Sequence, residues 1–75
     1  MSKDKTKLVN YLISTIRDAD LSTFPIDNSE YLSVVSSIIC QFDTDVAISV
    51  MNGLIDSFGE DAKNQELSVK INYGY

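Results

Sequence analysis

The residue types that most often carry out chemistry in proteins are scarce in this sequence. It has no histidine, so the commonest general base is absent, and Cys40 is its one cysteine. A thiol with no histidine to activate it is more typical of a small packed residue than of a nucleophile. The usual zinc sets built from Cys and His are also missing, and an internal disulfide is impossible.

The remaining candidates for chemistry are carboxylates and glycines. Asp43 and Asp45 form an Asp-x-Asp pair, but neither the glycine nor the closing glutamate of a calcium loop follows them. Helix capping explains both residues better. The three glycines, Gly53, Gly59 and Gly74, are too scattered for a phosphate-binding loop. We therefore expect no enzymatic activity, no cofactor and no bound metal.

The charge distribution is more informative than the net charge of -5. No Lys or Arg occurs between Asp18 and Ala62, although acidic residues are frequent there. Such a segment repels nucleic acid and favours basic partners, while a simpler interpretation is that the acids cap helices and aid solubility. We predict contact with a basic protein surface, and no direct binding of nucleic acid. The candidate contact residues are Asp18, Asp20, Asp27, Glu30, Asp43 and Asp45.

Apolar spacing predicts three helices, over about 4–17, 28–42 and 45–58. The second has the clearest start, because Asp27 suits an N-cap and Glu30 follows three residues later as in a capping box. Its apolar ladder comprises Tyr31, Val34, Val35, Ile38, Ile39 and Phe42. The opposite side is rich in serine, which either packs closely against another helix or faces solvent.

The predicted third helix is apolar over more than half of its circumference. Such a helix is central in a bundle or buried between subunits. Gly53 inside it costs about 1 kcal/mol relative to alanine, which is reasonable where another helix crosses closely. The connection over 18–26 carries Leu21, Phe24 and Ile26, which we expect to anchor it to the core.

The last ten residues, "ELSVKINYGY", alternate between apolar and polar side chains and predict a strand over about 66–73. A lone strand leaves its backbone groups unpaired. It could pair with the segment around Thr23 and Phe24, with the same strand of a second copy, or with another protein; an unstructured terminus is the remaining alternative. We favour the dimer. The predicted oligomer-interface residues are Leu67, Val69, Ile71 and Tyr73.

Seventy-five residues correspond to a single small domain, here mainly α-helical. So small a core is marginal alone, which favours a homo-oligomer. The first apolar run, "LVNYLISTI", is too short and too polar for a signal peptide or a membrane span. With one cysteine, the sequence fits a reducing compartment, and we expect a cytoplasmic protein that does not bind membranes.

These features favour a small acidic protein–protein interaction module that binds a basic surface of a partner. Inhibitors made by mobile elements, such as anti-CRISPR proteins and DNA mimics, are analogous in size and charge. One alternative is a structural subunit that only self-assembles. Another is an oligomeric sponge for nucleotides or other small ligands, in which Lys3, Lys5, Lys7 and Arg17 would face the ligand.

Overall fold

The computed structural model describes residues 2–22 and 25–74, and this part of the chain folds into five helices. They are α1 (Lys3–Asp18), α2 (Asn28–Cys40), α3 (Thr44–Gly53), α4 (Ile55–Phe58) and α5 (Glu60–Asn72). The mainly helical class expected from the sequence is therefore confirmed.

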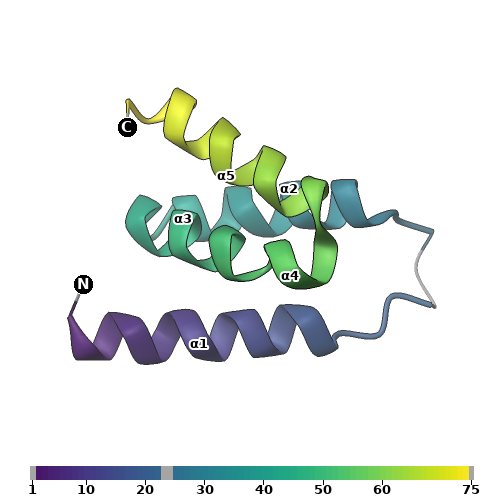
Figure 1. The fold of residues 1–75 in the computed structure, drawn as a ribbon, viewed down its shortest axis with the longest axis horizontal. Coiled ribbons are helices and arrows are strands. Elements are labelled where there is room, and N and C mark those ends of the chain that lie inside the picture. The colour runs from purple at the N-terminus through teal and green to yellow at the C-terminus, as the bar shows by residue number, and fades with distance from the viewer. Residues whose placement is uncertain (1, 23–24, 75) are drawn as a thin grey trace.

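Helix α3 occupies the centre of the bundle. It packs against α1, α2 and α5, and Figure 1 shows α1 and α5 on opposite sides of it. The long helices alternate in direction, so the α1–α2 connection, α4 and the start of α5 lie at one end of the molecule (Figure 1). The start of α1, the α2–α3 turn and the end of α5 lie at the other end.

The core forms where the apolar faces of the helices meet α3. Its largest fully buried side chains are Leu32, Val50, Met51 and Leu54. Three of these four belong to α3 or follow it directly, which confirms the central position expected from its wide apolar surface.

Side-chain caps fix the starts of the first three helices. The Ser2 hydroxyl accepts a hydrogen bond from the Lys5 amide, and Asp27 Oδ1 accepts one from the Glu30 amide at 2.8 Å. Asp43 Oδ1 accepts from the amides of Asp45 and Val46. The cap predicted at Asp27 is confirmed, and Asp43 is the residue that caps α3.

Two helix boundaries differ from the predicted ranges. Helix α2 ends at Cys40, and the predicted third helix is interrupted at Leu54. The Leu54 amide lies 3.1 Å from both the Val50 and the Met51 carbonyl oxygens, so the last turn of α3 tightens before α4 begins. Gly53 allows the predicted close crossing, since Ile13 of α1 lies directly against its backbone.

The C-terminal strand predicted over 66–73 is wrong, because these residues belong to helix α5 and its end. The structure has no strand in residues 2–22 or 25–74. Helix α5 buries Ala62, Glu66 and Val69, which recur at helical spacing. The alternation of larger apolar residues is a stronger pattern in the sequence, because of the three buried residues Glu66 is charged and Ala62 has only a methyl side chain. Acids in its first turn and Lys70 in its last also suit the helix dipole.

The connection between α1 and α2 was predicted to pack on the core through three apolar residues. Leu21 and Ile26 are half-buried and line an apolar depression of about 390 Å³ with Pro25 and Tyr31. The Tyr31 hydroxyl donates to the Ile16 carbonyl at 3.3 Å, which links α2 to the end of α1. Phe24, the third predicted anchor, and Thr23, a proposed strand partner, lie outside the described residues.

Candidate protein-interaction surfaces

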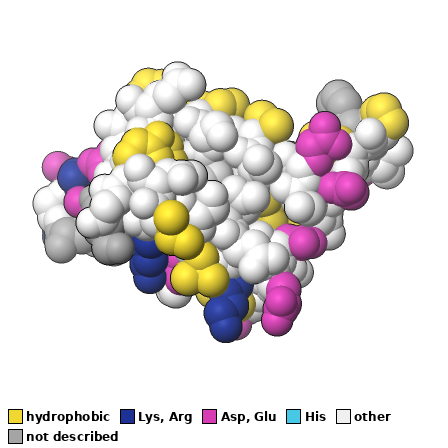
Figure 2. All heavy atoms as spheres, turned by 90° about the horizontal axis from the view of Figure 1, so that it is seen from above, with side chains coloured by type: hydrophobic (Ala, Val, Ile, Leu, Met, Phe, Trp, Pro, Cys, Tyr) yellow, Lys and Arg dark blue, Asp and Glu magenta, His cyan; other side chains and the backbone are white. Residues whose placement is uncertain are grey.

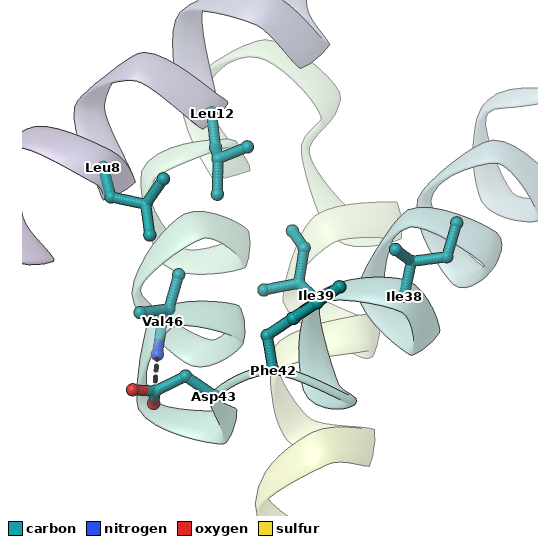
Figure 3. Close-up of a pocket in the computed structure, with 7 residues that line it drawn as sticks. All are labelled: Leu8, Leu12, Ile38, Ile39, Phe42, Asp43 and Val46. Carbon is teal, nitrogen blue, oxygen red and sulfur yellow. Dashed lines mark hydrogen bonds between the residues drawn. The ribbon is translucent and has the colours of Figure 1, made fainter.

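An apolar groove separates α1 from α2. Both helices pack on α3 but hardly touch each other, which leaves a channel of about 360 Å³ between them. We call this channel the apolar groove. Its lining residues are Leu8, Leu12, Ile38, Ile39, Phe42, Asp43 and Val46. In Figure 3, Leu8 and Leu12 point from α1 toward Val46, and the α2 side chains line the opposite wall.

The rims of the apolar groove carry large apolar side chains that face solvent. Phe42 is 84% exposed, Ile38 is 52% exposed and Leu8 is 47% exposed. Tyr11 extends the α1 rim and Val34 extends the α2 rim, and both are also exposed. Single exposed apolar residues are ordinary on protein surfaces, whereas several on two facing helices make this surface a candidate for an interaction.

Asp43, which lines the apolar groove, takes part in an ion pair with Lys5. Lys5 Nζ of α1 lies 2.6 Å from Asp43 Oδ2, so it joins α1 to the first turn of α3. The hydrogen bond from Lys5, followed by the amide of Val46, lowers the pKa of Asp43 from its ordinary value of 3.8. Asp43 therefore has a structural role in this fold, as both a helix cap and half of an ion pair.

One end of the molecule collects most of the negative charge. Figure 1 shows that the end of α1, the start of α2, α4 and the start of α5 lie toward this end. We call this surface the acidic end, and its carboxylates are Asp18, Asp20, Asp27, Glu30, Asp56, Glu60 and Asp61. On the face drawn in Figure 2, several acidic side chains gather toward the right-hand end, and others lie beside the dark blue cations at the lower centre and the left.

The acidic end accounts for the whole net charge of the protein. Its seven carboxylates share that half of the molecule with two cations, Arg17 and Lys63. The other half has four carboxylates and four lysines, so the formal charge of -5 belongs to the acidic end. Within it, the amide and hydroxyl of Ser22 lower the pKa of Asp20, which keeps this carboxylate ionised.

The six acids predicted as partner contacts do not form one surface. Asp18, Asp20, Asp27 and Glu30 lie at the acidic end, whereas Asp43 and Asp45 lie at the opposite end of the bundle. Sequence reasoning missed the contribution of Asp56, Glu60 and Asp61. These three acids lie in the first turns of α4 and α5. The sequence alone does not show that they are close to the acids of α2, because that depends on where α5 starts.

The four predicted interface residues are also separated. Val69 is only 4% exposed and packs in the core, while Leu67, Ile71 and Tyr73 face solvent. A strand would have placed all four on one face, whereas a helix distributes them around its axis. Their role as a shared strand interface is lost with the strand itself.

A polar groove of about 420 Å³ lies between α2 and α5. Its walls carry serine hydroxyls and amide side chains, including Ser33, Ser37, Gln65 and Asn72. Ser36 is buried there, which confirms that the serine-rich side of α2 is in part a packing seam for another helix. Cys40 is half-buried at this groove as a free thiol.

The described residues, 2–22 and 25–74, contain no group of three or more Cys, Asp or Glu side chains placed to hold a metal ion. None of their helices is both long enough and apolar enough to cross a lipid bilayer.

No protein-family model, no curated protein and no solved structure matches this chain. The fold and its surfaces define only a class: a small helical bundle with one acidic end and one exposed apolar groove.

Proposed function

We propose that this protein is a small interaction module whose acidic end binds a basic surface of a partner protein. The observation that supports the proposal is the placement of the entire net charge at one end of the bundle. A charge so concentrated creates a directional field that accelerates encounter with basic partners and repels acidic ones. An inhibitor that covers a basic site on its target would act in this way.

A nucleotide or small-ligand sponge stays an alternative that requires an oligomer, because Lys3 and Arg17 of one chain stand near opposite ends of α1, about 21 Å apart at 1.5 Å per residue.

The experiment compares two variants with the same change in charge. Asp56→Asn/Glu60→Gln removes two carboxylates from the acidic end. Asp4→Asn/Asp45→Asn removes two from elsewhere and serves as the matched control. All four residues are exposed acids in the first turn of a helix, so the effects on folding should be similar.

The immobilised wild-type protein and both variants are used to capture proteins from lysate over a series of salt concentrations. We expect a partner that the wild type and the control retain, that the acidic-end variant loses, and that salt elutes. Equal retention by all three proteins, or retention that salt does not weaken, would rule out the proposed function.

A further inference from the structure

We infer that the polar groove between α2 and α5 is a binding site for an uncharged sugar, a mono- or disaccharide. The inference is independent of the proposed function, because the polar groove shares no lining residue with the acidic end. Its lining residues fall within 33–41 and 65–73. Figure 1 shows α5 running in the same general direction as α2 and tilting away from it toward the C-terminus.

The first argument is a buried hydroxyl that lacks a partner. Ser36 is only 3% exposed and lines the polar groove. Its hydroxyl makes no hydrogen bond within residues 2–22 and 25–74, whereas the large majority of buried polar side chains in proteins are paired. In this part of the chain, no wholly inaccessible side-chain polar atom lacks a partner, so the Ser36 oxygen is reached from the groove. A ligand hydroxyl placed there would supply the missing hydrogen bond.

The second argument is the arrangement of the other polar groups. They recur on successive turns of both helices and so form two facing rows, each about 12 Å long at 1.5 Å per residue. The rows comprise Ser33, Ser37 and Gln41 on the α2 side and Gln65, Ser68 and Asn72 on α5. Hydroxyl and amide side chains both donate and accept hydrogen bonds, as the hydroxyls of a sugar ring do. The two rows can therefore pair with neighbouring hydroxyls of one ligand.

The third argument is that the lining excludes other classes of ligand. None of the described residues that line the polar groove is charged. Glu66 and Lys70, the charged residues on this stretch of α5, bind each other at 3.5 Å. A phosphate or nucleotide would find no cation in the lining, and the net charge of -5 would repel it. An amphipathic helix requires an apolar groove, whereas Val69 is the one aliphatic residue among those described here.

An aromatic residue completes the site. Tyr73 follows α5, is 54% exposed and lines the polar groove. One side of a sugar ring is formed by C–H groups, and an aromatic ring offers a flat apolar surface to it. The neighbouring Asn72 amide donates to the Ser68 hydroxyl at 3.3 Å, which orients this amide in the groove. The volume of about 420 Å³ also falls within the range of about 300–1,000 Å³ that is usual for small-ligand sites.

The test titrates the isotope-labelled full chain with neutral sugars and follows its backbone amide signals by NMR. The panel contains glucose, galactose, mannose, N-acetylglucosamine, maltose and lactose. We expect at least one sugar to shift the amide signals of residues 33–41 and 65–73 in a saturable way. Glucuronate and galacturonate, which add a carboxylate to the same rings, should bind about tenfold more weakly than their neutral counterparts, because the groove has no cation to pair with them.

Two serine variants test the role of the buried hydroxyl. Ser36→Ala should raise the dissociation constant of the bound sugar about tenfold through the lost hydrogen bond. Ser49→Ala is the matched control, because Ser49 is a half-buried serine of α3 that does not line the groove, and its affinity should equal that of the wild type. Urea unfolding should show no loss of stability in Ser36→Ala, since its hydroxyl has no partner and alanine is the better helix former.

Three results would overturn the inference. The first is the absence of a saturable response to every sugar in the panel, or equal affinity of Ser36→Ala and the wild type. The second is a response to an uncharged Ser-Asn peptide without a response to any sugar, which would make the groove a peptide site. The third is a clear loss of stability in Ser36→Ala without ligand, which would show that the fold itself uses this hydroxyl.

Discussion

Gly53 of α3 lies directly against Ile13 of α1, so that a β-carbon at position 53 would overlap Ile13 Cδ1 and stand 3.1 Å from Ile13 Cγ1. We predict that Gly53→Ala destabilises the protein by about 1 kcal/mol. Overpacking costs about 1–3 kcal/mol, and the better helix propensity of alanine offsets about 1 kcal/mol of this. Urea unfolding followed by circular dichroism measures the change.

A double-mutant cycle isolates the contact. Ile13→Val removes the Cδ1 atom that a new methyl group would meet, so Gly53→Ala should be nearly neutral in that background. Asn52→Ala, at the exposed neighbouring position, reports helix propensity without the clash. An equal loss of stability from Gly53→Ala in both backgrounds would show that the two residues are not in contact.

Local sequence signals predicted the first three helices well, because their information lies within a few residues. The Asp27 cap and the apolar ladder of α2 specify both a start and a buried side. Gly53 inside a predicted helix indicates that another helix crosses closely there, although the sequence does not show which helix it is. In each case the residues that specify the feature lie in the same short segment as the feature itself.

The C-terminal helix was missed because its buried side is a weak apolar signal. Glu66 is buried although it is charged, and Lys70 Nζ lies 3.5 Å from its carboxylate. A pattern built from apolar residues leaves out a buried charged residue such as Glu66. It includes the exposed Leu67 and Ile71 instead. Tertiary contact with α2 and α3, which no local pattern reports, decides which side of the segment is buried.

The apolar groove and the acidic end were not predictable, because both depend on which helices become neighbours. The acids of α4 and α5 join those of α1 and α2 only because α5 starts at the same end of the bundle (Figure 1). Likewise, Ile38 and Phe42 belong to a regular apolar ladder that suggested a core position. They remain exposed because α1 and α2 pack on α3 rather than on each other.

Val69 and Ile71 distinguish the helix from the strand that the sequence suggested. We predict that Val69→Ala lowers the free energy of unfolding by about 2 kcal/mol, from the lost apolar burial and the cavity left in the core. Ile71→Ala should change it by less than about 0.5 kcal/mol, since Ile71 is a surface residue. Denaturant unfolding of both variants gives the comparison. Similar costs at the two positions would support a strand, in which they share a face.

Gly59 connects α4 to α5 with φ 62° and ψ -133°, a conformation that L-residues rarely adopt. We predict that Gly59→Ala destabilises the protein by about 1–3 kcal/mol through backbone strain. Steric overlap does not contribute, because no atom lies within 4 Å of the position that a β-carbon would occupy. Thermal and urea unfolding provide the measurement.

Chemical synthesis of the chain with D-alanine at position 59 provides the control. A D-residue accepts positive φ and restricts the unfolded chain, so this protein should be at least as stable as the wild type. If D-alanine and L-alanine destabilise equally, the cost does not come from the handedness of the backbone at Gly59.

The Asp43–Lys5 pair makes stability depend on pH in a defined direction. Because the pKa of Asp43 is lowered in the folded protein, its contribution is present above the unfolded value of about 3.8. It is lost as pH falls through the lower folded pKa. Asp43→Asn keeps an oxygen that can cap α3 but removes the charge that pairs with Lys5. The wild type should therefore be more stable than Asp43→Asn at neutral pH, and the difference should disappear in acid.

Lys5→Met tests the cause of this pH dependence, and Lys7→Met is its control on the same helix turn. Since the hydrogen bond from Lys5 is the largest influence on the Asp43 carboxylate, Lys5→Met should reduce the loss of stability that Asp43→Asn causes. Lys7→Met should leave that loss intact. Urea unfolding at a series of pH values, applied to each lysine variant with and without Asp43→Asn, gives the coupling directly. A loss that survives Lys5→Met at full size would show that the cap contacts with Asp45 and Val46, and not the ion pair, hold Asp43 in its charged form.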